Sequence, residues 1–416
     1  MPGQLVRVYH IARRFVQDKW GGTEAVVYNY CAQLSKSGIN NQIFATDIFC
    51  DKKRDEMNGI RINRFSYVFP WLFLNREARE KLKLKGGSPL SLPMFFHLLF
   101  NKKPSLIHTH VQHRLGGIAR TIAKLRKIPY VVSLHGNYLT LPQGEADKMM
   151  SPFKGKPEWG KAFGFLWGSR KTVSDADAVI CVDRNEFECL KETYPNKKIV
   201  YFPNGVEIDK FRGKTGDIFK NKYGIDKDEK YILCLSRIDY QKNQRLLVKA
   251  FSEFSKSNPE YKLVIAGPIT VENYFEEIQQ DVKEHHLEDK VVIFPGFEPG
   301  DPMLAEAYAG ADFFVLPSKH EPFGIVILEA WAAGTPVIAS RLPGIEAFSN
   351  DEQNILHFES DNDSDLLSKM KYMIEPGVKQ KLQAEASKEV EKYSWEVVVN
   401  KLQELYCELI ENKERK

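Results

Sequence analysis

Short apolar segments alternate along almost the whole chain with longer amphipathic segments of helical period. In the first half, the apolar segments predict strands at 6–10, 42–46, 105–109, 130–134, 178–182 and 198–202. In the second half, they predict strands at 231–235, 262–266, 291–294, 312–316 and 336–339. Many of these runs are continuously apolar, which is typical of strands that are covered on both faces.

The order of these elements predicts an α/β protein. Strands that alternate with helices of about 10–15 residues form parallel sheets with right-handed crossovers. One sheet of about eleven strands would be unusually wide, so we expect two Rossmann-like, doubly wound domains. The turn signal at Pro203-Asn204-Gly205 gives domains at 1–205 and 206–393. Because such domains bind ligands at the carboxyl ends of their strands, we expect them to face each other across one cleft.

The composition excludes several classes of protein. The 416 residues contain 59 Lys and Arg against 55 Asp and Glu, a formal net charge of +4, and 43% of them are hydrophobic. Such a chain can bury a core, so it is not disordered, and its charge balance is too even for a dedicated nucleic-acid binder. We therefore expect no nucleic acid among its partners.

Cysteines and apolar runs indicate a cytoplasmic protein. The six cysteines are scattered with no C-x-x-C pair, which is typical of reduced thiols in a cytosolic protein. Arg13 and Arg14 interrupt the first apolar run before it reaches the length of a signal peptide. No run approaches the roughly 18 apolar residues of a spanning helix. We expect the chain not to cross a membrane.

The segment with the most chemical information runs from Lys319 to Ala330. It follows a predicted strand and opens into a predicted helix, which places Glu321 in the loop and Glu329 about two turns inside the helix. Gly324 at the helix start lets backbone N–H groups approach an anion closely. Two carboxylates beside such a helix start could hold the hydroxyls of a nucleotide sugar, although two solvated glutamates would explain the same residues.

Three further motifs follow predicted strands. Arg237 and Lys242 lie where cations could hold a diphosphate leaving group, or they are ordinary surface residues. Gly21 and Gly22 lie between the first strand and the first helix, where they would let a phosphate approach the backbone, although any tight turn uses glycine. His135 ends a strand; a lone histidine is more often structural, yet the end of a parallel strand is typical of functional residues.

Taken in order, these motifs resemble the retaining glycosyltransferases of family 4, which have the GT-B fold. The motifs cover nearly the whole chain, and the ordered set is far more specific than any one of them. In chain order they are Gly21-Gly22, the strand from Leu106 to His110, Pro203-Asn204-Gly205-Val206-Glu207 with Phe211, the Arg237 to Lys242 element, Ala266-Gly267-Pro268, Pro295-Gly296-Phe297, Glu321-x7-Glu329 and Tyr393-Ser394-Trp395-Glu396.

The resemblance implies that these positions bind a nucleotide-diphosphate sugar. Glu329 would hold the ribose hydroxyls and Glu321 would contact the transferred sugar. Arg237 and Lys242 would stabilise the departing diphosphate, and His135 would lie near C6 and the anomeric region of the sugar. Backbone N–H groups of Phe323, Gly324 and Ile325 would bind sugar hydroxyls and phosphate. Gly21 and Gly22 would approach the phosphates from the first domain. Gly267 and Phe297 would frame the base.

The implied reaction moves a hexosyl unit from a UDP- or GDP-hexose with retention. The acceptor hydroxyl would attack on the face that the diphosphate leaves, and the leaving phosphate oxygen would take its proton. No metal and no cofactor beyond the donor are expected, because Arg237 and Lys242 would replace a metal. Asp175-Ala176-Asp177 spells the metal-binding D-x-D motif of other glycosyltransferases, but it precedes a buried strand and is interpreted as a helix end. The resemblance also implies that the final helix, 394–416, returns to the first, acceptor-side domain.

The segment 69–103 bears on the acceptor, which we expect to be a glycan or a lipid-linked molecule of cell-envelope polysaccharide or glycolipid synthesis, including lipopolysaccharide. Residues 76–103 contain seven Lys and Arg against two Glu, a local charge of +5 among many apolar residues. The favoured interpretation is a surface that meets anionic lipid at the inner face of the cell membrane. The alternative is a loop and helix pair packed on the first domain with its lysines in water.

Other functions fit parts of the pattern. A small soluble acceptor, as in sucrose- or trehalose-type enzymes, is the alternative within the transferases. A GT-B-like epimerase of nucleotide sugars has two domains and a nucleotide cleft, but it would not need the Arg237, Lys242, Glu321 and Glu329 combination. A non-catalytic sensor would bind the nucleotide sugar without turnover.

Overall fold

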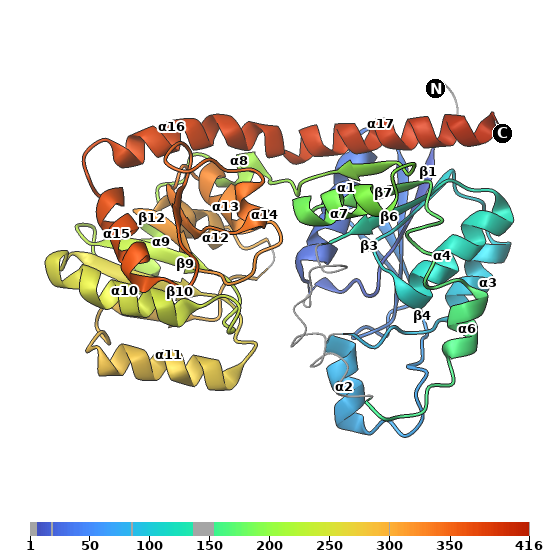
Figure 1. Cartoon of the computed structure of the whole chain (residues 1–416), viewed down its shortest axis with the longest axis horizontal. Coiled ribbons are helices and arrows are strands. Elements are labelled where there is room, and N and C mark those ends of the chain that lie inside the picture. Colours follow the sequence, from blue (N-terminus) through green and yellow to red (C-terminus); the bar gives the residue numbers. More distant parts are fainter. Residues whose placement is uncertain (1–5, 18–19, 85, 136–153, 299, 416) are drawn as a thin grey trace. The chain divides into compact units, whose positions relative to one another are not determined.

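The chain folds into two compact units (Figure 1). The structure is a computed structural model that describes residues 6–17, 20–84, 86–135, 154–298 and 300–415. Unit 1 ends at Pro203 and is joined by the C-terminal residues from Trp395, while unit 2 runs from Asn204 to Ser394. The division lies close to the predicted boundary after residue 205. Each unit has a sheet with helices on its faces, which confirms the predicted α/β class.

An eight-stranded sheet forms the centre of unit 1. Its order is β3-β4-β2-β1-β5-β6-β7-β8, and every pair is parallel except β3 with β4. Because β1 lies between β2 and β5, the direction of sheet growth reverses there and the loops that follow β1 and β5 diverge. The strands are β1 (Arg7–Ile11), β2 (Asn40–Thr46), β3 (Arg54–Met57), β4 (Ile60–Phe65), β5 (Leu106–Thr109), β6 (Tyr130–Leu134), β7 (Ala178–Cys181) and β8 (Ile199–Tyr201).

Both faces of this sheet are covered, which explains its continuously apolar strands. On one face Tyr9 packs with apolar side chains of α3 and α4. On the other, Val8 packs with α1 and α17, because successive strand residues point to opposite faces. The helices of unit 1 are α1 (Gly22–Lys36), α2 (Arg76–Leu84), α3 (Leu92–Phe100), α4 (His113–Arg126), α6 (Lys161–Leu166), α7 (Arg184–Thr193) and α17 (Trp395–Glu414).

Unit 2 has a six-stranded sheet in the order β11-β10-β9-β12-β13-β14, in which every pair is parallel. Its growth reverses at β9, between β10 and β12. The strands are β9 (Lys230–Leu235), β10 (Tyr261–Ala266), β11 (Val291–Phe294), β12 (Phe313–Leu316), β13 (Val337–Ser340) and β14 (Leu356–Phe358). The helices are α8 (Ile208–Phe211), α9 (Asp217–Tyr223), α10 (Gln244–Ser257), α11 (Glu272–Glu284), α12 (Met303–Ala309), α13 (Ile325–Ala332), α14 (Pro343–Glu346), α15 (Asp363–Met373), α16 (Val378–Val390) and the 3-10 helix η3 (Glu391–Tyr393).

Every predicted strand overlaps an observed one, but β3, β4 and β14 were missed. In β4, buried and more exposed positions alternate, so a search for continuously apolar runs passes over it, and β3 is largely polar. These two strands form a hairpin at Asn58-Gly59, whose positive φ angles of 49° and 80° suit a two-residue turn. The expectation of purely parallel sheets is therefore wrong at this edge of unit 1.

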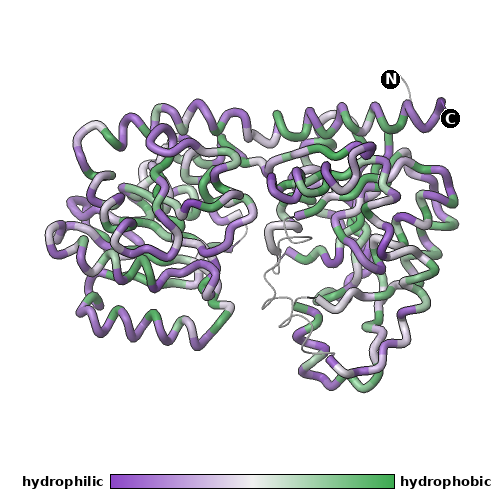
Figure 2. Tube along the Cα trace, viewed as in Figure 1, coloured by the Kyte–Doolittle hydropathy of each residue, from purple (hydrophilic) through white to green (hydrophobic). Residues whose placement is uncertain are grey.

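The last helix, α17, packs on unit 1, where the sequence analysis expected it. Apolar side chains recur along it at helical spacing, and Figure 2 shows the resulting alternation of hydrophobic and hydrophilic stretches. Buried Val398, Leu402 and Leu405 belong to the same cluster as Val8 and Tyr30. The helix therefore completes one face of the first sheet although it is the last element of the chain.

Candidate active site

The predicted donor-binding residues of unit 2 follow the carboxyl ends of its strands. Arg237 and Lys242 follow β9, Gly267 follows β10 and Phe297 follows β11, while the segment with Glu321 follows β12. Parallel strands bring all of these loops to one edge of the sheet, and β9 and β12 flank the point where growth reverses. Open α/β sheets bind ligands at such a reversal.

Asp239 organises the loop that carries Arg237 and Lys242. Its Oδ1 accepts hydrogen bonds from the backbone N–H groups of Gln241 (3.0 Å) and Lys242 (3.2 Å). Its Oδ2 lies 3.2 Å from the Arg237 guanidinium. The sequence analysis gave Asp239 no role, although an Asp whose side chain accepts from the backbone two residues on is a common turn signal.

Lys242 and Glu321 form an ion pair. The Lys242 Nζ lies 2.5 Å from Glu321 Oε2, and their side chains are only 13% and 12% exposed. The two loops are also joined where the backbone N–H of Lys319 donates to the carbonyl of Gln241 at 2.7 Å. The structure thus brings together the predicted diphosphate cation and the predicted sugar-contacting carboxylate, while Arg237 stays 48% exposed beside Asp239.

Gly267 packs against the loop after β9. A Cβ at this position would lie 1.9 Å from the carbonyl oxygen of Ser236, and the φ of 150° is one that other residues rarely adopt. The backbone N–H of Ile238 also donates to the carbonyl of Pro268 at 2.9 Å. Phe297, at the next strand end, joins an aromatic cluster with Phe294. Any larger residue at Gly267 would move the loop that carries Arg237 and Lys242.

The start of α13 is a left-handed turn. Gly324 has a φ of 85° and precedes Ile325, the first residue of the helix. The side chain of Phe323 is buried against Phe348, with ring centroids 4.8 Å apart. The backbone at the start of α13 can therefore be offered to a ligand, because the first N–H groups of a helix have no intrahelical acceptor.

Glu329 lies further along α13, where it accepts a hydrogen bond from the buried Tyr308 hydroxyl at 2.9 Å. Burial raises the pKa of Glu329 to about 7, while the Tyr308 bond and the charge of Lys210 act in the opposite direction. The carboxylate is thus held in place and poised between its charged and neutral forms at neutral pH. Sequence reasoning missed Tyr308, because it reaches Glu329 only through the fold.

In unit 1, the glycine pair lies at the start of α1. The N–H of Gly21 donates to Glu24 Oε2 at 3.0 Å, and the other oxygen of Glu24 accepts from Arg14 Nε at 3.1 Å. A carboxylate of the chain therefore occupies the position at this helix start that was predicted for a phosphate. A Cβ at Gly22 would meet nothing within 4 Å, so the backbone there is open to approach.

His135 lines a cavity of about 1220 Å³ within unit 1. The cavity lies at the carboxyl edge of the sheet, among the segments that follow β1, β5 and β6. Its lining includes seven cationic side chains and two carboxylates, with apolar residues between them. The cations are Arg13, Arg14, Arg114, Arg120, Lys161, Arg170 and Lys171, and the carboxylates are Glu24 and Glu158.

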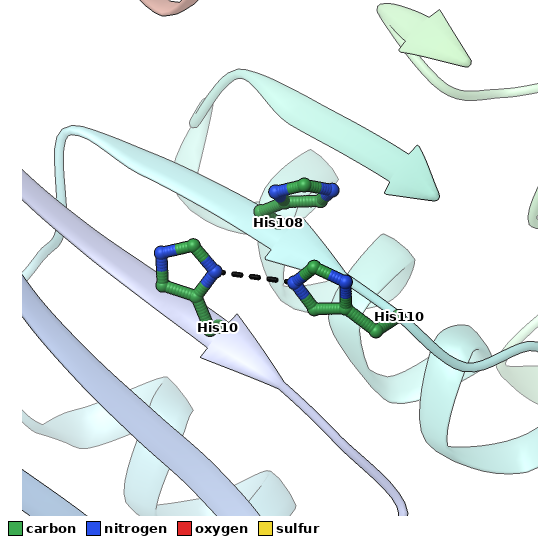
Figure 3. Close-up of side chains that lie close together, drawn as sticks. All are labelled: His10, His108 and His110. Carbon is green, nitrogen blue, oxygen red and sulfur yellow. Dashed lines mark hydrogen bonds between the residues drawn. The ribbon is translucent and has the colours of Figure 1, made fainter. Parts of the chain in front are cut away.

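Three buried imidazoles lie together on two adjacent strands of the same sheet (Figure 3). His10 comes from β1, His108 from β5 and His110 from the residue just after β5. Among the described residues, their ligand atoms form a group within 4.8 Å of one another that could geometrically hold a metal ion. The sequence analysis expected no metal and did not single out these histidines; their signal was two histidines two residues apart at a strand end.

The D-x-D motif is engaged in ion pairs and hydrogen bonds within unit 1. Asp175 pairs with Arg120 and with Lys124. Asp177 accepts a hydrogen bond from the backbone N–H of Tyr130 at 2.8 Å. Asp175 lies in a turn, so its interpretation as a helix end is wrong. The two carboxylates bind different partners of the protein.

The segment 69–103 has both buried and exposed apolar side chains; its residue 85 lies outside the described residues. Leu82 of α2 is buried in a small cluster with Trp71 and Leu74 of the same segment, whereas Met94 of α3 is buried in the main cluster on the first sheet. Other large apolar side chains of the segment remain exposed: Leu72, Phe73, Leu84, Leu92, Phe96 and Phe100. No helix in the described part of the chain has the length and apolar character needed to cross a bilayer.

Two Rossmann-like units of this kind, with ligand-binding loops at the carboxyl edges of their sheets, define the GT-B class of glycosyltransferases. The family comparisons agree. Residues 20–210 match the family model described as Glycosyltransferase Family 4, and residues 216–393 match Glycosyl transferases group 1. The chain belongs to this glycosyltransferase family, as the sequence resemblance indicated.

Two curated relatives and two solved structures are similar to this chain, and all but one of these matches cover most of it. An uncharacterized glycosyltransferase of Methanocaldococcus jannaschii is 28% identical over 85% of each chain. Alpha-monoglucosyldiacylglycerol synthase of Streptococcus pneumoniae is 30% identical over 59% of this chain and 54% of its own length. Sucrose-phosphate synthase of Thermosynechococcus elongatus has a TM-score of 0.72 at 21% identity, covering 98% of this chain and all of its own. HepE of Anabaena, determined with UDP and glucose, has a TM-score of 0.71 at 14% identity, covering 97% and 100%.

Proposed function

We propose that the chain is a retaining hexosyltransferase that binds a UDP- or GDP-hexose in unit 2 and transfers the hexose to an acceptor bound by unit 1. The observation that carries the proposal is the convergence of Arg237 and the Lys242–Glu321 pair where the growth of the second sheet reverses. A leaving diphosphate gains negative charge, and fixed cations stabilise it. Glu329, held by Tyr308, supplies an acceptor for ribose hydroxyls.

The Lys242–Glu321 pair suits a site that alternates between free and bound states. Without donor, Glu321 neutralises Lys242; with donor, the diphosphate competes for the ammonium group and leaves the carboxylate for the sugar. Arg237 adds a second cation in a planar fork that matches a phosphate. Two protein cations can thus stabilise the leaving group, so we propose turnover without an added divalent metal.

The acceptor that best fits unit 1 is an anionic, lipid-linked molecule. Lys161, Arg170 and Lys171 line the cavity without an ion pair to any described carboxylate, so they are available to a phosphate. Leu84 and Phe165 also line it and are strongly exposed, at 60% and 89%, which suits an apolar chain. The similarity to the relative named alpha-monoglucosyldiacylglycerol synthase supports a lipid acceptor. The structural similarity to sucrose-phosphate synthase supports the alternative, a small phosphorylated acceptor.

Turnover of donor by a Glu321 variant tests the proposed function. We expect wild-type protein to release UDP or GDP from a nucleotide hexose and to transfer the hexose with retention, also in excess EDTA. Glu321→Gln should lower kcat by about 10²–10³-fold, because an interaction made in the transition state is lost. Its UDP affinity should stay equal or rise, because Lys242 is released from its partner.

The matched control is Glu385→Gln, which removes the exposed Lys388–Glu385 ion pair on α16. It should change neither kcat nor UDP affinity. Binding without turnover by the wild type would indicate a sensor, and conversion of the donor to an isomeric nucleotide sugar would indicate an epimerase. Faster transfer to fructose 6-phosphate than to a lipid-linked glycan would favour the soluble acceptor.

We further propose that the protein works at the inner face of the cell membrane, with α3 against anionic lipid. Phe96 and Phe100 lie one turn apart on α3 with parallel rings and are 52% and 77% exposed. Lys102 and Lys103 follow after Asn101. Such a surface combines apolar insertion with attraction to anionic headgroups.

Liposome flotation tests the membrane proposal. Wild-type protein should float with phosphatidylglycerol vesicles and much less with phosphatidylcholine vesicles. The double variant Phe96→Ser/Phe100→Ser should bind at least about tenfold more weakly, because each buried phenyl ring contributes at least about 1.5 kcal/mol. Leu125→Ser, which removes a 63% exposed side chain of α4, is the control and should bind as the wild type does. Equal binding of the double variant and the wild type would contradict the proposal.

A further inference from the structure

A chain of hydrogen bonds runs from the core of unit 1 to His135. Its Nε2 lies 3.3 Å from Nδ1 of His110, and Nε2 of His110 lies 3.1 Å from Nδ1 of His10. The remaining nitrogen of His10, Nε2, lies 3.3 Å from Oδ1 of Asn41. Figure 3 shows the central link between His10 and His110. Four side chains thus form one continuous path that ends at the cavity.

Asn41 sets the direction of every bond in this path. Its amide nitrogen lies within 3.3 Å of the carbonyl oxygens of Cys31 and Ile39, which can only accept hydrogen bonds. The amide oxygen must therefore face His10 and accept a proton from its Nε2. In a neutral His10, the other nitrogen, Nδ1, then carries a lone pair and accepts from its next neighbour.

The same reasoning carries along the path. His110 donates from Nε2 to His10, which leaves its Nδ1 as an acceptor, and His135 then donates from Nε2 to that nitrogen. Burial supports the neutral state of all three rings, because it lowers the pKa of His10 and His135 to about 4 and that of His110 well below its usual value. A neutral ring has one donor and one acceptor, so the path allows a single arrangement.

We propose that Asn41, His10 and His110 are positioning residues that fix His135 in its Nε2–H tautomer, so that its Nδ1 is the nitrogen left to accept a hydrogen bond from a substrate hydroxyl. The assignment of the substrate to His135 rests on the proposed function. The tautomer itself rests on the hydrogen bonds and the burial of these side chains within unit 1 and does not depend on the substrate.

His108 lies beside this path but is not part of it. Its Nδ1 lies 2.5 Å from the Tyr406 hydroxyl and its Nε2 lies 2.7 Å from Ser133 Oγ. With these bonds, both nitrogens of His10, His108 and His110 have hydrogen-bond partners. A metal ion on the three rings would have to displace the bond between His10 and His110, so hydrogen bonding accounts for the cluster better.

The tautomers can be measured on the donor-free full chain with ¹⁵N-labelled histidine, from two-bond ¹H–¹⁵N correlations. We expect His10, His110 and His135 each to appear as a single Nε2–H tautomer at pH 7.5. An Nδ1–H tautomer at any of the three in the wild type would overturn the proposal. So would one equivalent of zinc that stays bound through dialysis and is lost on substitution of His10.

Substitutions at Asn41 test the direction of control. Asn41→Leu has a similar shape but no acceptor, so His135 should become a mixture of tautomers, and kcat should fall by the same factor as the Nε2–H population. Asn41→Asp keeps an acceptor and should restore the single tautomer. His108→Phe, a buried ring outside the path, should leave the His135 tautomer unchanged. A His135 that stays in one tautomer in a folded Asn41→Leu or His10→Phe protein would contradict the proposal, whereas absence of turnover in the wild type would contradict only the proposed function.

Discussion

Glu329 shows how one side chain of the candidate site responds to its surroundings. Its carboxylate is partly buried on α13, beside the hydroxyl of the fully buried Tyr308. Burial opposes ionisation and raises its pKa to about 7 from an ordinary value of 4.5. The folded chain thus binds a proton between these pH values that the unfolded chain has lost. The stability that this proton contributes is complete below pH 4.5 and is lost as the pH rises through 7.

Substitution of this residue should therefore separate stability from binding. At pH 8, Glu329→Gln should raise the free energy of unfolding by on the order of 1 kcal/mol, because no buried charge has to form. The same change should weaken UDP binding by about 10–100-fold, because a charged acceptor for the ribose hydroxyls is lost. Calorimetric binding and urea unfolding measure the two effects. Glu375→Gln, an exposed position of unit 2, is the control, and equal UDP affinity in both variants would contradict the assignment.

At the scale of elements, the stability of unit 1 depends on helix α17. Its apolar stripe covers one face of the sheet together with α1. Its Tyr406 hydroxyl also reaches His108 on β5, so the helix contributes a polar contact inside the core. Removal of α17 would therefore expose the apolar face of the sheet and leave the buried imidazole of His108 without its tyrosine partner.

Truncation and point substitution should show this dependence. Deletion of 395–416 should abolish the cooperative unfolding of unit 1, and hydrogen exchange should show lost protection in β1 and β5. Leu402→Ala should lower the free energy of unfolding of unit 1 by about 2–5 kcal/mol, because it leaves a cavity in a packed cluster. Glu404→Ala, on the exposed side of the same helix, should cost little. Normal protection of β1 and β5 in the truncated chain would contradict the prediction.

At the scale of the whole molecule, the two units differ in their buried histidines. Most of the histidines with a lowered pKa are in unit 1, and unit 2 contributes one, His357. Burial is the main cause in every case. The buried or partly buried residues of unit 1 are His10, His97, His108, His110 and His135. Because the pKa of these histidines is lower in the folded chain, the unfolded chain binds protons at a higher pH than the folded chain does. The stability that the neutral histidines contribute is therefore present above pH 6.5 and is lost as the pH falls from 6.5 towards about 4.

Scanning calorimetry between pH 7.5 and 5 should therefore separate the units. We expect the transition of unit 1 to move to lower temperature as the pH falls, while that of unit 2 moves much less. UDP at pH 7.5 should raise the transition temperature of unit 2. At 100 times its Kd, bound UDP should add about 2.7 kcal/mol to the free energy of unfolding of that unit. Parallel shifts of both transitions with pH would contradict the histidine argument.

The fold could be predicted from the sequence further than the site could. Continuous apolar runs located the strands of both sheets, because strands covered on both faces have no polar side to dilute the signal. Strands β3 and β4 were not predicted, because β3 is largely polar and β4 alternates buried and more exposed residues, so neither forms a continuous apolar run. At the site, motif spacing indicated which loops share an edge. It could not show that Lys242 contacts Glu321 or that Tyr308 contacts Glu329, since these contacts join loops and helices far apart in sequence.

The contact between Tyr406 and His108 joins residues 298 positions apart, and it has a consequence for synthesis. As the chain leaves the ribosome, the strands of unit 1 emerge before unit 2, but the helix that covers one of their faces emerges after it. Val8, Val26 and Tyr30 can contact one another early, but their cluster is not complete until α17 has been made. Unit 2, whose residues are contiguous, can fold during that interval. Unit 1 is thus begun before unit 2 and completed after it, and part of its apolar surface stays uncovered in the meantime.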